Sequence, residues 1–258
     1  MNAATEVLLE THLIRGRDTL VVYASFWPLL EDLDFHLLSL GIQHDALTRQ
    51  LLGDGLTALG LHLATRPVEE YVGWTVSIQK PMMNLFFTGT ADTGCIVGRA
   101  FLDGVEPRQE NVFISQSKRD FGEPQVSNIS VAGIDVFAMV EQFYEQSEQK
   151  VGRFFHRELD HAFLLSLPGA KREWLEQVET DEVFEQRACS RVEHLSTRSL
   201  HFRCGCDKMK IAGILVGAYG RSPEALFGED REVEVECPRC AARILVNRED
   251  YENLLREG

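Results

Sequence analysis

The chain has 258 residues, of which 44% are hydrophobic and 26% charged, so it can form one large domain with a small additional one. Its formal net charge of -14 argues against a nucleic-acid partner, because binding to phosphates needs a basic surface. No apolar run reaches the roughly 20 residues that cross a bilayer, and residues 1–15 lack the regions of a secretory signal. We therefore expect a cytoplasmic protein with no membrane partner.

Residues 1–168 predict one α+β domain that mixes sheet and helix. Leucines at helical spacing predict a helix over 45–65, where glycines would let another backbone approach closely. A second helix is predicted at 134–146. Alternating or apolar runs predict strands at 74–78, 85–90, 96–102, 111–117, 125–132, 151–155 and 161–167, with a hairpin turn at 92–94.

The composition changes after Pro168–Gly169. Residues 169–200 are rich in charge, and Thr180–Asp181 separates two thin apolar stripes. The stripes consist of Trp174, Leu175 and Val178, and of Val183, Phe184, Ala188 and Val192. Short helices with narrow apolar faces depend on docking for their stability, so this segment is predicted to be a metastable helical linker.

Residues 201–258 predict a small C-terminal domain. A helix is expected at 208–219, strands at 231–236 and 243–246, and a last short helix capped by Asn247.

Four of the six cysteines gather in this last domain. Cys204-Gly205-Cys206 is followed by thirty residues (207–236) and then by Cys237-Pro238-Arg239-Cys240. A CxxC turn brings two sulfurs to one metal ion, and Gly205 would relieve the tighter CxC turn. The pattern predicts one Zn²⁺ per chain, held by Cys204, Cys206, Cys237 and Cys240. Basic residues near these ligands could offset the charge of four thiolates: Arg203, Lys208, Lys210, Arg239 and Arg243.

Spacing alone leaves the role of the zinc open, and most four-thiolate sites are structural. A catalytic zinc is disfavoured, because such a site keeps an open position and because His156-Arg157-Glu158 matches only half of the zinc deaminase pattern. A thiol oxidoreductase is a weaker reading, since its CxxC normally opens a helix in a βαβ unit. We therefore predict no enzymatic activity. His156 and His161, with His194 and His201, are expected to be ordinary surface or strand residues.

The two remaining cysteines lie outside the quartet. Cys95 falls in a predicted strand, where it is expected to be a small buried apolar residue. Cys189 falls in the linker, where it is either an apolar contact or a fifth redox-responsive thiol.

These motifs resemble those of the redox-regulated heat-shock chaperone family of thirty-three kilodaltons, a family of zinc-binding holdases. The C-terminal CxC and CxxC look like its zinc signature, and Lys118–Pro124 looks like its K-D-L-G-x-x-E-P segment in shortened form. The helix at 134–144 followed by Ser147-Glu148-Gln149, and the leucine-rich stretch 46–63, are also similar.

The resemblance implies an ATP-independent holdase whose reduced, zinc-bound form is inactive. Oxidation would form the disulfides Cys204–Cys206 and Cys237–Cys240, release zinc, unfold the tail and undock the linker. The apolar surface uncovered in this way would bind unfolding client proteins, and the resemblance implies that two copies can pair on activation. The alternative is a zinc-stapled adaptor that binds other proteins without redox switching.

Overall fold

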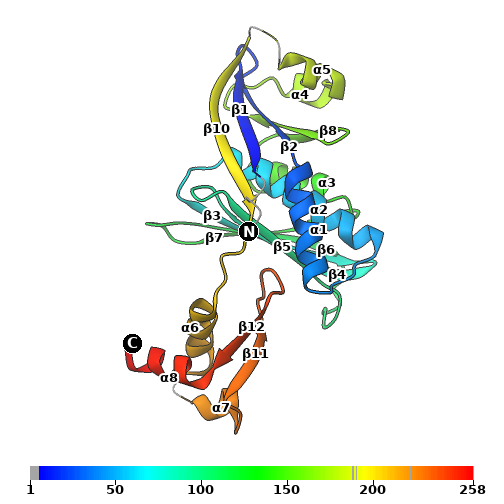
Figure 1. The fold of residues 1–258 in the computed structure, drawn as a ribbon. Coiled ribbons are helices and arrows are strands. Elements are labelled where there is room, and N and C mark those ends of the chain that lie inside the picture. Colours follow the sequence, from blue (N-terminus) through cyan, green and yellow to red (C-terminus); the bar gives the residue numbers. More distant parts are fainter. Residues whose placement is uncertain (1–5, 188, 190, 221, 258) are drawn as a thin grey trace. The chain divides into compact units, whose positions relative to one another are not determined.

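The structure is a computed structural model that describes residues 6–187, 189, 191–220 and 222–257, and the chain divides into the units 1–203 and 204–258 (Figure 1). The division leaves the predicted linker, 169–200, within the first unit. Ala188, a member of the second apolar stripe, lies outside the described residues.

The first unit is built on a sheet of ten strands, counted among its described residues. One half contains, in spatial order, β8 (Gly152–Arg157), β9 (Asp160–Ser166), β2 (Thr19–Ser25), β1 (Val7–Ile14) and β10 (Val192–Phe202). The other half continues with β5 (Cys95–Phe101), β4 (Met82–Thr90), β3 (Glu70–Gln79), β6 (Asn111–Arg119) and β7 (Gln125–Val131). A short parallel pairing joins the halves, with His201 opposite Cys95 and Phe202 opposite Ile96.

Three helices pack on the sheet and form the main core: α1 (Trp27–Ser39), α2 (Ala46–Ala64) and α3 (Val136–Gln146). Helix α2 confirms the predicted helix over 45–65, and it begins where the Asp45 carboxylate accepts a hydrogen bond from the Thr48 backbone N–H at 2.7 Å. Two of its glycines, Gly55 and Gly60, leave room for aromatic side chains rather than for another backbone. A Cβ at Gly55 would clash with the Phe87 ring, and one at Gly60 would clash with the Phe26 ring.

Two short helices, α4 (Arg172–Gln177) and α5 (Thr180–Gln186), occupy the first part of the predicted linker. The prediction of a helical segment is wrong from Val192 onward, because residues 192–202 form strand β10 beside β1. Pairing with β1 overrides the local pattern there. Most side chains of β10 remain at least partly exposed, and only Leu200 is fully buried, so its sequence lacks the apolar signature of a core strand.

The second unit is small. It contains α6 (Lys208–Tyr219), α7 (Pro223–Phe227), the hairpin strands β11 (Glu232–Glu236) and β12 (Arg243–Asn247), and α8 (Arg248–Glu257). Its elements match the predicted ones closely. Few of its described apolar side chains are buried: Ile211, Ala212, Phe227, Ala241, Val246 and Tyr251.

Both units confirm the predicted α+β class. No helix of the described residues is long and apolar enough to cross a membrane.

Candidate metal centre

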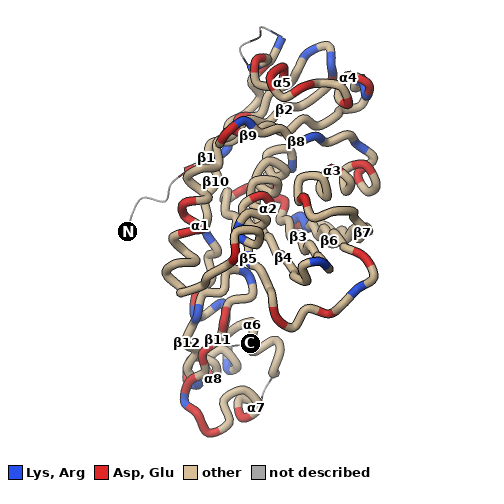
Figure 2. The backbone as a smooth tube through the Cα atoms, turned by 90° about the vertical axis from the view of Figure 1, so that its right-hand side faces the viewer, with Lys and Arg blue, Asp and Glu red and all other residues tan. Residues whose placement is uncertain are grey.

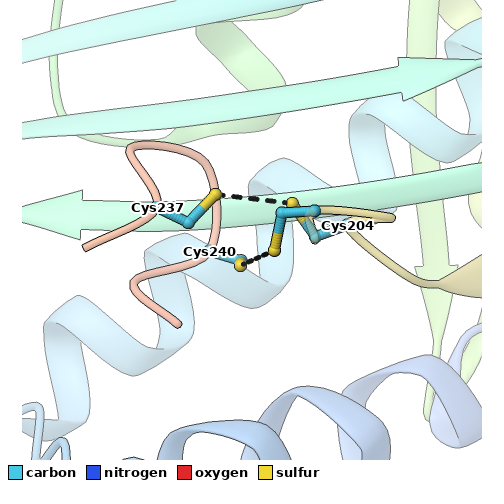
Figure 3. Close-up of side chains that lie close together, drawn as sticks. Cys204, Cys237 and Cys240 are labelled. Carbon is cyan, nitrogen blue, oxygen red and sulfur yellow. Dashed lines mark hydrogen bonds between the residues drawn. The ribbon is translucent and has the colours of Figure 1, made fainter. Parts of the chain in front are cut away.

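The structure brings together the four cysteines that the sequence singles out (Figure 3). Cys204 and Cys206 lie directly before α6, and Cys237 and Cys240 lie in the turn between β11 and β12. All four come from the second unit, so this unit contains the complete cluster.

Backbone hydrogen bonds fix the turn between β11 and β12. The last pair of the hairpin is Glu236 with Arg243, so the strands hold the two ends of the turn at a set separation. Within the turn, the Cys237 N–H donates to the Ala242 carbonyl at 2.8 Å, and the Ala241 N–H donates to the Cys237 carbonyl at 2.9 Å. The turn therefore presents Cys237 and Cys240 to the same point, as a CxxC metal knuckle does.

The CxC turn is fixed by the beginning of α6. Gly205 has a φ of 65°, a conformation that other residues rarely adopt, which confirms the reason for a glycine between the two ligands. The Asp207 carboxylate caps α6 by accepting from the Lys210 N–H at 2.8 Å. The Lys210 ammonium group donates to the Gly205 carbonyl at 2.7 Å, which ties the turn to the helix.

The sulfur positions fit one tetrahedral metal ion. The Sγ atoms of Cys204 and Cys237 are 3.7 Å apart, those of Cys206 and Cys240 are 3.5 Å apart, and all four lie within 4.8 Å of one another. Four sulfurs placed 2.3 Å from a zinc ion would be about 3.8 Å from each other. None of these four cysteines is in a disulfide, since a disulfide requires sulfurs about 2.05 Å apart.

The electrostatics of the cluster also favour a cation. A hydrogen bond with Cys240 lowers the pKa of the Cys204 thiol to about 5, and the Arg239 guanidinium acts in the same direction. Burial raises the pKa of Cys206 to about 11, and the hydrogen bond to Cys204 holds the pKa of Cys240 well above its usual range. Like charges at this separation cannot all ionise, so four thiolates require a compensating cation.

The predicted basic residues have different positions. Arg239 lowers the pKa of Cys204, as just described. Lys208, Lys210 and Arg243 form ion pairs with Asp250, Asp207 and Glu236, which reduce the charge they can offer to the thiolates. Arg203 is the last residue of the first unit.

The other predicted residues lie in the first unit. Cys95 begins β5, where it is half-buried rather than buried, and Cys189 lies between α5 and β10. A hydrogen bond from the Arg191 backbone N–H lowers the pKa of Cys189. The four histidines named above all lie on strands, as expected: His156 on β8, His161 on β9, and His194 and His201 on β10.

An apolar contact, which we call the linker surface, lies under α4 and α5, and the sequence did not indicate its sheet side. Leu175 of α4, Val178 directly after α4 and Val183 of α5 are buried against the sheet, with Phe184 beside them. The sheet side chains that receive them come from β1, β2, β8 and β9: Ile14, Val21, Tyr23, Phe155, Ala162 and Leu164. The apolar run of residues 19–25 is the sequence signal that could have located this surface.

Arginine side chains form contacts between these helices and the sheet. Arg153 of β8 donates to the carbonyls of Leu175 and Glu176, at 2.8 and 2.9 Å, at the end of α4. Two further guanidinium groups of the sheet and its loops lie over linker rings, Arg17 over Trp174 at 4.8 Å and Arg157 over Phe184 at 4.7 Å.

One further arginine, at the end of the linker helices, contacts side chains of the sheet. Arg187, directly after α5, lies over the ring of Tyr23 and forms an ion pair with Glu10 of β1. The Tyr23 hydroxyl donates to the Val183 carbonyl at 2.7 Å. Figure 2 shows acidic residues on both α4 and α5, and a basic residue at the start of α4. The helices are thus held by a small apolar contact and by polar contacts near solvent.

Comparison with known proteins gives one family. The sequence model of the Hsp33 protein family matches residues 42–247. The crystal structure of the 33 kDa chaperonin (heat shock protein 33 homolog) of Thermotoga maritima is similar over 99% of both chains, with a TM-score of 0.73 and 14% sequence identity. No curated protein sequence matches the chain.

Proposed function

The chain belongs to the Hsp33 protein family and is a chaperone of that type, and we propose that it is an ATP-independent holdase switched on by oxidation. The observation that carries the proposal is the cluster of four cysteine sulfurs in a unit that buries few apolar side chains. A unit of this kind depends on its metal centre for stability, and its ligands are atoms that oxidants attack. We also propose a cytoplasmic location, because thiols persist in the reduced form in that compartment.

In the resting state, Cys204, Cys206, Cys237 and Cys240 would hold one Zn²⁺ as thiolates. Zinc bound there would keep the sulfurs deprotonated and join the CxC turn to the β11–β12 turn. The binding free energy of structural zinc, on the order of 10–16 kcal/mol, contributes directly to folding in small domains. Loss of the ligand set would therefore unfold residues 204–258.

Oxidation by a peroxide removes that ligand set. One thiolate attacks the peroxide and becomes a sulfenic acid, with the second peroxide oxygen leaving as water after it takes up a proton. A second thiol then displaces water from the sulfenic acid. Each disulfide therefore uses one peroxide molecule, which takes two electrons from the pair of sulfur atoms. We propose the pairs Cys204–Cys206 and Cys237–Cys240, the pairing that the family resemblance implies. Disulfide sulfurs no longer serve as thiolate ligands.

Strand β10 connects the metal centre to the linker. Cys204 follows Arg203, whose N–H donates to the Ile96 carbonyl at 3.0 Å, and the pairing of β10 with β5 spans only two residues. At its other end, β10 begins at Val192, shortly after α5. Unfolding of the tail would free the end of β10, and fraying of this weakly buried strand would loosen the helices that precede it.

Release of α4 and α5 would uncover the apolar face described above. Val21, Tyr23 and Leu164 of the sheet would become accessible, together with the apolar faces of the helices themselves. Contiguous apolar surface of this kind binds the exposed segments of unfolding proteins without any nucleotide. The family resemblance implies in addition that two activated copies can pair.

One experiment tests the proposal. The zinc-loaded protein is treated with peroxide at mild heat, while a metallochromic dye follows zinc release and light scattering follows an aggregating client. We expect zinc release and suppression of aggregation to rise together, and the Cys95→Ser variant to behave like the parent. Zinc release without suppression would contradict the holdase. Zinc that stays bound to a folded tail would favour the structural adaptor.

A further inference from the structure

A groove of about 340 Å³ opens beside the end of α5, on the sheet face that the linker helices cover. Strands β1, β2 and β9 and the beginning of α1 contribute to its walls. We call it the acidic groove and define it by Glu6, Leu8, Trp27, Asp160, Phe184 and Arg187.

The groove exposes large apolar side chains. Leu8 of β1 is 51% exposed and Trp27 of α1 is 50% exposed. Tyr23 and Phe184 also line it, and both are buried with their rings side by side. Aromatic and aliphatic side chains around a concave surface are typical of sites that bind an apolar group.

Its charge is negative. Three carboxylates, those of Glu6, Glu10 and Asp160, line the groove together with the single guanidinium of Arg187, which pairs with Glu10. His161 adds no positive charge at neutral pH, because burial lowers its pKa to about 4. Two negative charges therefore remain beside the apolar walls, and they favour a cationic partner.

The groove is continuous with the covered surface. Tyr23 and Phe184 line the groove and are also part of the apolar contact between α5 and the sheet. The groove is thus the part of that face which stays open while the linker is docked. A segment bound in it would already lie at the edge of the surface that linker release uncovers.

We propose that the acidic groove binds extended polypeptide segments in which apolar side chains lie next to lysine or arginine. The proposal rests on the proposed chaperone function and names the class of client segment recognised first. Binding in the groove does not make the reduced form a holdase, because the larger apolar face stays covered by α4 and α5. Apolar side chains would contact Leu8 and Trp27, and the neighbouring cations would lie near Glu6 and Asp160. A second copy of this chain is a poor occupant, because its net charge of -14 would oppose approach to an acidic site.

The test uses the reduced, zinc-loaded full chain and two labelled peptides of ten residues. One peptide alternates leucine with lysine, and the other alternates leucine with glutamate. Fluorescence anisotropy should show binding of the leucine–lysine peptide, weakening with added salt, and much weaker binding of the leucine–glutamate peptide. Equal affinity for both peptides would overturn the proposal.

Matched variants locate the site. The double variant Glu6→Gln/Asp160→Asn should weaken the leucine–lysine peptide by roughly fivefold, as expected for two exposed charges. The control Glu123→Gln/Asp120→Asn makes the same change of net charge at exposed positions outside the groove and should leave binding unchanged. Equal weakening by both double variants would show that the binding is a general effect of net charge, which overturns the proposal.

The apolar contact has its own pair of variants. Trp27→Ala should weaken binding by roughly tenfold, as for a central aromatic contact. Phe35→Ala removes another exposed aromatic ring from α1, outside the groove, and should have no effect. Self-association that is lost in Trp27→Ala would make a second copy the occupant and would overturn the proposal.

The outcome is separable from that of the proposed function. Suppression of client aggregation by the oxidised protein is measured in parallel for each variant. If that suppression persists and the groove variants bind peptide like the parent, the proposal of a peptide site in the groove is wrong and the proposed holdase function is retained. If the groove variants no longer bind the peptide but the oxidised parent does not suppress client aggregation, the groove is a peptide site and the proposed holdase function is wrong.

Discussion

Replacing Arg153 by alanine should loosen α4 from the sheet while leaving the metal centre intact. The guanidinium donates two hydrogen bonds to the last carbonyls of α4, and its position over the Phe155 ring, at 5.0 Å, holds it in place. A hydrogen bond from a charged group contributes about 1.5–3 kcal/mol when buried. Arg153 is only partly buried, so we expect the lower part of that range for the two bonds together, about 2 kcal/mol.

A loss of about 2 kcal/mol raises the ratio of undocked to docked linker roughly 30-fold. The reduced, zinc-loaded Arg153→Ala protein should then suppress client aggregation without peroxide. Limited proteolysis should cut within 170–187 before it cuts elsewhere in the first unit. The metal content of the variant should equal that of the parent, since Arg153 is not part of the unit that contains the thiols.

Arg99→Ala is the matched control, because it removes a guanidinium that lies over the ring of Phe101 at 4.6 Å within β5, outside the linker contact. This variant should remain inactive until oxidised. The reasoning is refuted if Arg153→Ala keeps its linker as protected as the parent and stays inactive when reduced. Leu175→Ala, which removes a fully buried linker side chain, should act in the same direction as Arg153→Ala and more strongly.

Three further predictions follow from individual residues. Glu70→Gln should lower the free energy of unfolding of the first unit by about 3 kcal/mol in urea titrations, because the buried Glu70 carboxylate pairs with two arginines, whereas the exposed Glu123→Gln should change it little. The free energy of unfolding should fall as the pH drops from about 6.5 towards 4, because the unfolded chain then takes up more protons than the folded one. Burial lowers the pKa of His62 well below its usual value and that of His161 to about 4. His161→Gln should make this pH dependence less steep, and an unchanged slope would contradict the role given to His161. Removal of metal by a chelator should abolish the circular dichroism of residues 204–258 and leave the first unit folded, and a tail that stays helical without metal would contradict its dependence on zinc.

The sequence predicted those parts of the fold in which local pattern and tertiary environment agree. The leucine spacing of α2 and the turn between β4 and β5 are of this kind, and so are the elements of the zinc unit. The four cysteines were identified because their spacing alone restricts what they can bind.

Strand β10 was missed because its position depends on pairing with distant segments. Its residues are mostly polar and carry no alternation that a local reading could detect, yet β1 and β5 lie on its two sides. Strands β1 and β2 were also not predicted as such. The linker surface was missed for the same reason, since it appears only when β1, β2, β8 and β9 are placed side by side.

Arginine contacts and the acidic groove depend on side-chain positions that no spacing rule encodes. Arg153 and Leu175 are 22 residues apart in the chain, and nothing in either segment indicates that they meet. The groove joins residues from both ends of the first unit, such as Glu6 and Arg187.

The most direct test of the central claim is hydrogen exchange of α4 and α5 before and after peroxide treatment of the zinc-loaded protein. Protection of their backbone amides depends on bonds such as those from Val178 to Trp174 and from Val183 to Glu179, at 2.9 and 3.1 Å. We predict that this protection disappears together with the metal, while that of β3 is retained. A tail that loses its metal and unfolds, beside helices α4 and α5 that stay as protected as β3, would contradict the claim that the thiol cluster controls the linker.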